Sequence, residues 1–190
     1  RPIKTTYYEL VIRVDVLVEG YRDVADSWAL DAIRELSRRQ IITGYPDYTF
    51  RPDAPVTRAE AAALLARAKG WEGTSSVRYK DVPNRHWAAS AIAAATAAGV
   101  FQGYADGSFQ PERPITRAEM AAVIVRMMEE KPLVRSTAPF SDVPPDHWAA
   151  GAIWRAKERG WLNGYPGGTY RPAGNTSREE FAAIVYRLIQ

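Results

Sequence analysis

Three arginines occupy the same chemical setting in this sequence, each directly after a hydroxyl residue and two residues before a glutamate. The three phrases are Thr57-Arg58-Ala59-Glu60, Thr116-Arg117-Ala118-Glu119 and Ser177-Arg178-Glu179-Glu180. A guanidinium beside the outward-pointing N–H groups of a helix N-terminus can hold a carboxylate. The arginines therefore indicate a site for a negatively charged ligand.

The hydroxyl residue and the glutamate of each phrase have a structural role. A hydroxyl residue followed three positions later by glutamate, just before an alanine-rich apolar run, is typical of a capping box. The phrases thus predict second helices that run to about Lys69, Glu129 and Ile189. An arginine at the first helical position faces the positive end of the helix dipole, at a cost of about 0.3–1 kcal/mol, so capping does not account for it.

The phrases recur about every 60 residues, and other residues recur with them. The tryptophans Trp28, Trp87 and Trp148 keep the same spacing, as do the Gly-Tyr pairs that begin at Gly44, Gly103 and Gly164. This pattern predicts a mainly α module of three helix-loop-helix units. We place a preceding strand or linker at 1–20 and the repeats at 21–78, 79–139 and 140–190, so that 21–190 is one module.

Each repeat is expected to begin with a first helix near its tryptophan. In the first repeat Trp28, Ala32, Ile33 and Leu36 share a helical face, and equivalent residues do so in the other two. This predicts that the tryptophans are core anchors, with a ring edge that can line a groove. Residues 7–18 alternate between apolar and polar, which predicts a short β-strand outside the repeats.

Composition excludes several classes of protein. The 190 residues carry a net charge of +3, which lacks the dense basic stripe usual for nucleic-acid binding. The absence of cysteine excludes disulfides and thiolate metal sites, and no stretch approaches the roughly 20 apolar residues of a membrane span. The chain begins at Arg1 without an initiator methionine, so we expect it to be part of a longer protein.

No constellation of catalytic residues stands out. Equivalent glutamates in three copies share similar environments and are engaged in capping, whereas a glycoside hydrolase needs two carboxyl groups in different environments. His86 and His147 are matched by Ser27 in the first repeat, so a helix-cap or groove hydrogen bond suits them better than a metal. The aspartates before the first helices are expected to cap or turn the chain: Asp23, Asp81 and Asp142. We expect a binding module with no cofactor and no metal, not an enzyme.

The run from aromatic-x-Asp-Val, through His-Trp-Ala, Gly-Tyr-x-Asp-Gly-x-Phe and x-Pro, to Thr-Arg-Ala-Glu resembles the S-layer homology module. The resemblance covers residues 21–190 in three copies. It implies a pseudo-threefold arrangement of the repeats with grooves between neighbouring units. It also implies noncovalent anchoring of a larger protein at the bacterial cell surface, through an anionic secondary cell-wall polysaccharide that often carries pyruvylated amino sugars.

By this resemblance, the groove residues are the arginines, the residues around each tryptophan, and the polar-Gly pair that ends each first helix. In this sequence they are Arg58, Arg117 and Arg178; Trp28, Trp87 and Trp148 with Asp26, Ser27, Arg85, His86, Asp146 and His147; and Thr43-Gly44, Gln102-Gly103 and Asn163-Gly164. The third copy departs from the pattern, because Glu179 adds a carboxylate beside Arg178 that could neutralise it.

Alternatives stay open for both the arginines and the ligand. The arginines could pair with carboxylates of the next repeat and hold the repeats together. We expect Arg58→Ala or Arg117→Ala to weaken glycan binding far more than it lowers stability, and equal losses would favour the holding role. The ligand could instead be peptidoglycan, or the grooves could bind a protein partner or a sister copy in a self-assembling surface array.

Overall fold

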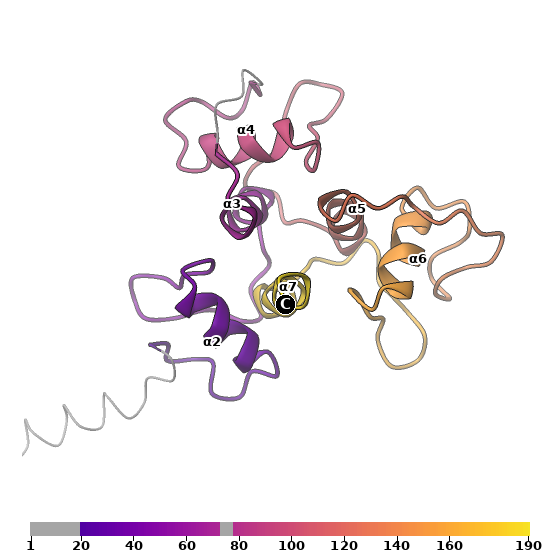
Figure 1. Cartoon of the computed structure of the whole chain (residues 1–190), viewed down its shortest axis with the longest axis horizontal. Helices are drawn as coiled ribbons and strands as arrows, with labels where there is room; N and C mark the ends of the chain where they lie inside the picture. Colours follow the sequence, from indigo (N-terminus) through magenta and orange to yellow (C-terminus); the bar gives the residue numbers. More distant parts are fainter. Residues whose placement is uncertain (1–19, 73–77) are drawn as a thin grey trace, which may run out of the picture. The chain divides into compact units, whose positions relative to one another are not determined.

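The computed structural model describes residues 20–72 and 78–190. These residues form six helices: α2 (Leu30–Arg38), α3 (Arg58–Lys69), α4 (Ala89–Ala97), α5 (Arg117–Met127), α6 (Ala150–Glu158) and α7 (Arg178–Leu188) (Figure 1). The prediction of a mainly α fold with two helices per repeat is confirmed. The strand predicted at 7–18 lies outside the described residues. No helix in the described ranges is both long and apolar enough to cross a membrane.

The second helix of each repeat begins at its capping phrase. In α3 the Thr57 hydroxyl accepts the N–H of Glu60 at 3.1 Å, and the Glu60 carboxylate accepts the N–H of Thr57 at 3.2 Å. Ser177 and Glu180 exchange the same two bonds at the start of α7. Helix α3 ends at Gly70, whose φ of 66° is in the left-handed region that favours glycine. These boundaries agree with the predicted ones because capping depends on neighbouring residues.

The first helix of each repeat begins two residues after its tryptophan, at Leu30, Ala89 and Ala150. The indoles therefore lie in the preceding turn and do not follow the helical period. Trp28, Trp87 and Trp148 are 62%, 60% and 65% exposed. The interpretation of the tryptophans as core anchors was wrong. The buried positions on these helices are instead aliphatic, among them Ile33, Ile92 and Ile153.

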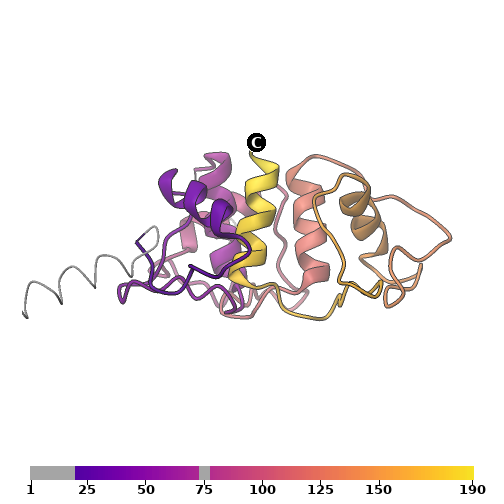
Figure 2. The ribbon, with the colours of Figure 1, turned by 90° about the horizontal axis from the view of Figure 1, so that it is seen from below.

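The chain divides into two compact units that cut across the repeats. Unit 1 holds residues 20–54 and Ser177–Tyr186, so it combines α2 with most of α7. Unit 2 runs from Pro55 to Thr176, with Arg187–Gln190, and contains α3 to α6. Within unit 2, α3 packs on α4 and α5 packs on α6, and both views show α6 crossing α5 steeply (Figures 1 and 2). In each case a second helix packs against the first helix of the following repeat.

Three backbone segments of unit 2, one from each repeat, close a hydrogen-bonded ring. The N–H of Val56 donates to the carbonyl of Thr176 at 2.9 Å, and that of Ile115 donates to Val56 at 2.9 Å. The N–H of Thr176 donates to Ile115 at 3.1 Å and completes the ring. All three residues are buried. The ring fixes the segments that lead into the second helices.

Each loop between the two helices of a repeat is held by an aspartate from before the first helix. The Asp81 carboxylate accepts the N–H groups of Phe109 and Gln110, both at 2.8 Å. Gln110 has a φ of 55°, so these bonds stabilise a left-handed conformation that a non-glycine residue rarely adopts. The aspartates thus hold a distant turn and do not cap the first helix. The same pairs of bonds join Asp23 to Phe50 and Arg51, and Asp142 to Tyr170 and Arg171.

Candidate binding groove

The arginines at the start of the second helices are buried. Arg58, Arg117 and Arg178 are 5%, 6% and 5% exposed. Arg58 Nε donates to the carbonyl of Phe109 at 2.8 Å and Nη2 to that of Gln102 at 2.9 Å. The equivalent bonds run from Arg117 to Tyr170 and Asn163, and from Arg178 to Phe50 and Thr43. Each guanidinium therefore holds both ends of a loop in another repeat, mainly through carbonyl oxygens.

The glycines of the polar-Gly pairs allow a close approach of an aromatic ring. A Cβ on Gly103 would lie 2.2 Å from Cε1 of Tyr79 and 2.8 Å from the carbonyl oxygen of Ser108. Gly44 and Gly164 have the same constraint against Tyr21 and Phe140. The glycines are therefore needed so that the aromatic ring can pack against the backbone after the first helix, independently of any contact with a ligand.

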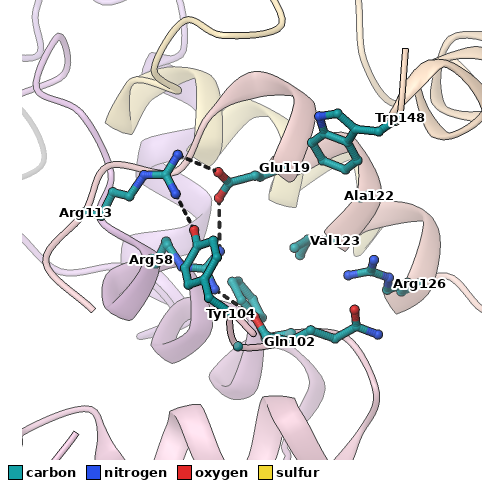
Figure 3. A pocket seen from close by; sticks show the side chains of 11 residues that line it. Arg58, Gln102, Tyr104, Arg113, Glu119, Ala122, Val123, Arg126 and Trp148 are labelled. Atoms are coloured by element: carbon teal, nitrogen blue, oxygen red, sulfur yellow. Dashed lines mark hydrogen bonds and ion pairs between the residues drawn. The ribbon is translucent and has the colours of Figure 1, made fainter. Parts of the chain in front are cut away.

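A groove with a volume of about 380 Å³ lies within unit 2. The start of α3, the loop after α4, one face of α5 and the turn before α6 all contribute to it, so residues of three repeats meet there (Figure 3). Its lining residues are Arg58, Phe101, Gln102, Gly103, Tyr104, Arg113, Glu119, Ala122, Val123, Arg126 and Trp148. An exposed indole, an apolar floor and several guanidinium groups thus share one concave surface.

The groove carries three guanidinium groups and one carboxylate. Glu119 accepts from Arg58 Nη1 at 3.0 Å and lies 3.2 Å from Arg113 Nη2, and its side chain is only 16% exposed. The Arg113 side chain is 41% exposed. Partial burial lowers the pKa of Arg126 from its ordinary value, but a guanidinium stays charged at neutral pH. The accessible cations of the groove are therefore Arg113 and Arg126.

The residue before each tryptophan supports the start of the first helix. His147 Nδ1 accepts the N–H of Ala149 at 3.1 Å, and its ring stacks on Trp148 with a centroid distance of 5.8 Å. His86 makes the same bond to Ala88 and stacks on Trp87 at 5.7 Å, and the Ser27 hydroxyl accepts the N–H of Ala29. The helix-start hydrogen bond expected of the histidines is confirmed. In the described part of the chain, no cluster of three or more His, Cys, Asp or Glu could hold a metal.

Unit 1 has a smaller pocket, of about 250 Å³, beside Trp28. Glu179 lines it and accepts from the Ser27 hydroxyl at 2.7 Å and from Trp28 Nε1 at 2.8 Å. The extra carboxylate of the third phrase is thus engaged with Ser27 and Trp28. Asp23, Asp26, Asp53 and Glu179 face a single cation, Arg22, in the lining of this pocket. Its charge is opposite in sign to that of the groove in unit 2.

The structure brings together some of the residues that the sequence predicted. Arg58, Gln102, Gly103 and Trp148 line the groove, and Asp26, Ser27 and Trp28 line the pocket of unit 1. Within the described residues, the other predicted ones line neither: Arg117, Arg178, Trp87, Arg85, His86, His147, Asp146, Thr43, Asn163, Gly44 and Gly164.

Sequence reasoning missed Tyr104, Arg113, Glu119 and Arg126 as groove residues. Arg126 had a signal, because Arg67 and Arg187 stand at the same position of the other second helices. Tyr104 and Glu119 also recur in every repeat, but they were assigned to the loop and to the cap. Arg113 had no such signal.

These features define a binding module built from three tandem helical repeats with a positively charged, aromatic groove. The chain belongs to the S-layer homology domain family, whose model matches residues 20–62, 78–121 and 139–182. The three matches fall on the three repeats.

Several surface proteins and an enzyme contain a similar stretch. Cell surface glycoprotein 1 of Acetivibrio thermocellus is 36% identical over 165 residues, which is 80% of this chain and 7% of that protein. A cellulosome-anchoring protein of the same bacterium is 35% identical over 157 residues, 78% of this chain and 35% of that protein. An amylopullulanase of Thermoanaerobacterium thermosulfurigenes is 35% identical over 177 residues, 90% of this chain and 9% of that enzyme. The chain thus spans from 7% to 35% of the length of these relatives and is a module of bacterial surface proteins.

Proposed function

We propose that this chain anchors a larger protein to the bacterial cell envelope by binding an anionic cell-wall polysaccharide in the groove of unit 2. The observation that carries the proposal is that the exposed indole of Trp148 shares one groove with the two accessible guanidinium groups, those of Arg113 and Arg126. An indole face covers the apolar face of a pyranose, and a guanidinium binds a carboxylate in a bidentate manner. A negatively charged sugar needs both.

The remaining groove residues suit the same ligand. The side chain of Gln102 reaches into the groove opposite Glu119, where it can bond to sugar hydroxyls (Figure 3). Ala122 and Val123 form an apolar floor. A carboxylate carried on a sugar ring, as in a pyruvyl ketal, would bind Arg126 while the ring lies on Trp148. The names of the cell-surface and cellulosome-anchoring relatives support an anchoring role.

The buried arginines contribute to this function by positioning. Arg58 holds the carbonyls of Gln102 and Phe109 and thereby sets the groove wall. Arg117 and Arg178 hold the equivalent loops in the same way. We propose that Trp28 and Trp87, which are equally exposed, offer further aromatic platforms to a repeating polymer. In this proposal the module only binds and needs no catalytic group. The catalytic activity of an enzyme such as the amylopullulanase relative then belongs to other domains of that enzyme.

The test is sedimentation of the chain with purified cell-wall sacculi of its source bacterium, before and after chemical removal of the secondary polysaccharide. Wild type is compared with Trp148→Ala and with Tyr48→Gly as a matched control. Tyr48 is another exposed aromatic residue, it lines neither pocket, and the other repeats have glycine at its position. We expect Trp148→Ala to weaken binding about tenfold or more, and Tyr48→Gly to leave it unchanged.

Each other outcome excludes the proposal in a different way. Binding that persists on stripped walls would assign the ligand to peptidoglycan. Binding to neither wall preparation would indicate a protein partner or a sister copy. Equal losses in the two variants would mean that any exposed aromatic contributes, and the groove would lose its special role.

A further inference from the structure

The tyrosine that follows each polar-Gly pair lies close to two arginines. In repeats 1 and 3, the first of these is one of the buried arginines that begin the second helices. The second directly follows the aromatic residue at the end of the loop. Arg51 lies 3.8 Å from the ring centre of Tyr45, and Arg171 lies 4.0 Å from that of Tyr165. Both arginines occupy the left-handed position of the loop, with φ of 58°.

Repeat 2 has glutamine, Gln110, at that left-handed position, and its second cation comes from elsewhere. Arg113, three residues later, lies 5.5 Å from the ring centre of Tyr104 and donates to the tyrosine hydroxyl. The equivalent residues in the other repeats are Ala54 and Gly174, so this arginine belongs to repeat 2 alone. The relocated cation lines the same groove as Trp148.

Arg113 also binds the glutamate of the phrase that begins α5. The Thr116 hydroxyl accepts the N–H of Glu119 at 3.1 Å, as in the other two boxes. The Glu119 carboxylate binds both Arg58 and Arg113. One carboxylate cannot neutralise two guanidinium groups, so the cluster of Arg58, Arg113 and Glu119 keeps a net positive charge. Arg113 keeps 41% of its side chain exposed and can accept a second anion.

We infer that Arg113 is a specificity-determining residue that gives the groove a second subsite for a carboxylate, separate from Arg126. In Figure 3, Arg113 and Tyr104 stand at one end of the groove, whereas Arg126 and Trp148 stand at the other. The groove therefore selects a glycan with carboxylates on more than one sugar over one with a single charge. This inference rests on the proposed function, since it names the charge pattern of the ligand of the same groove.

The test uses the full chain and the soluble polysaccharide released from the walls, with its carboxylates intact or chemically reduced to alcohols. Arg113→Gln is compared with Arg171→Gln, which makes the same change to a tyrosine-stacked arginine outside the groove, where repeat 2 already has glutamine. Calorimetry gives the dissociation constants, and thermal unfolding gives the stability of each variant.

We expect Arg113→Gln to weaken binding of the intact polymer about tenfold and to flatten its dependence on salt concentration. Arg171→Gln should stay within about twofold of wild type. On the reduced polymer the wild type and Arg113→Gln should bind equally, because the loss of the arginine and the loss of the carboxylate remove the same interaction.

Three results would overturn the inference. If wild type binds and Trp148→Ala does not, but Arg113→Gln binds normally, the proposed function stands and the second subsite is wrong. If both glutamine variants lose the same affinity, the effect is general charge attraction. If the wild type does not bind the polymer at all, the proposed function and the inference fail together.

Discussion

Arg58 Nε donates a hydrogen bond of 2.8 Å to the carbonyl oxygen of Phe109, 51 residues further along the chain. The same bond joins Arg117 to Tyr170 and Arg178 to Phe50, both at 2.7 Å. These bonds explain why arginine is tolerated at the positive end of a helix dipole. The guanidinium turns away from the N–H groups of its own helix and toward carbonyl oxygens of another repeat, whose partial negative charge compensates for the dipole.

Replacing Arg58 by alanine should lower the free energy of unfolding by about 3 kcal/mol, because two carbonyls and the Glu119 carboxylate lose a partner. Urea denaturation followed by circular dichroism measures the change. Arg135→Ala is the control, since its guanidinium is 44% exposed and pairs with Glu158, and it should cost less than about 1 kcal/mol. Unchanged stability with lost glycan binding would instead favour the ligand contact that the sequence predicted.

Thr176→Val should stabilise the protein by about 1 kcal/mol. The Thr176 hydroxyl is the one buried side-chain polar atom without a hydrogen-bond partner among the described residues. The equivalent ring residues are apolar, Val56 and Ile115, so the ring geometry accepts a β-branched aliphatic side chain. A higher midpoint of thermal unfolding would support this, with Thr137→Val on an exposed position as the neutral control. A lower midpoint would mean that the hydroxyl has a partner in solution.

Acid should destabilise the fold between about pH 4 and pH 2. Hydrogen bonds from the side chain and N–H of Ser108, with the charge of Lys80, lower the pKa of Asp106 to about 2. A carboxyl group with a pKa below its unfolded value stabilises the fold above that value, and the contribution is lost as the pH falls through the folded pKa. Burial raises the pKa of Asp142, but the N–H groups of Tyr170, Arg171 and Asp142 itself, together with the charge of Arg117, lower the pKa overall.

The urea midpoint measured against pH checks this expectation. Asp106→Asn should flatten part of the decline, because the amide does not titrate. A midpoint that stays constant from pH 4 to pH 2 would show that these carboxyl groups do not contribute to stability.

Glu179→Ala should change the environment of one indole and leave the groove of unit 2 intact. Alanine stands at the equivalent positions 59 and 118, so the substitution restores the pattern of the other repeats. Loss of the 2.8 Å bond from Trp28 Nε1 should move its indole N–H resonance upfield, while the other five tryptophan signals stay in place. Glu35→Ala, which removes a carboxylate paired with Arg38 and Arg39, should move none of the six. An unmoved Trp28 signal would mean that Glu179 does not hold this ring in solution.

The features that could be predicted from the sequence depend on neighbouring residues or on the repeat. The starts of α3 and α7 followed from hydroxyl and glutamate residues three positions apart, because a capping box is closed within one turn. The tryptophans were wrongly assigned to the core because the helical period was extended two residues before the true start of each first helix. At that point the chain is still in a turn. Arg58, Gln102 and Trp148 were expected in a groove because the sequence resembles the S-layer homology module, and all three line the groove of unit 2.

The sequence could not show which side chains of other segments pair with the glutamate of each capping phrase. The Glu119 carboxylate binds Arg58 and Arg113 in addition to its place in the capping phrase of α5. The ion pair with Arg113 could not be predicted, because Arg113 lies close to Glu119 only after the loop has folded. A residue without a counterpart in the other repeats gives no periodic signal, and its role depends on tertiary contacts.

Unit 1 joins two segments that the ribosome makes at different times. Arg178 and Phe50 are 128 residues apart, so at a synthesis rate of about 5–20 residues per second α7 follows α2 after on the order of ten seconds. During that time residues 20–54 lack the α7 segment that belongs to their unit, and the carbonyls of Thr43 and Phe50 lack Arg178, which binds them in the folded protein. The first repeat to be made is therefore the last to be completed, and it is the part of the nascent module that needs protection from proteases and aggregation the longest.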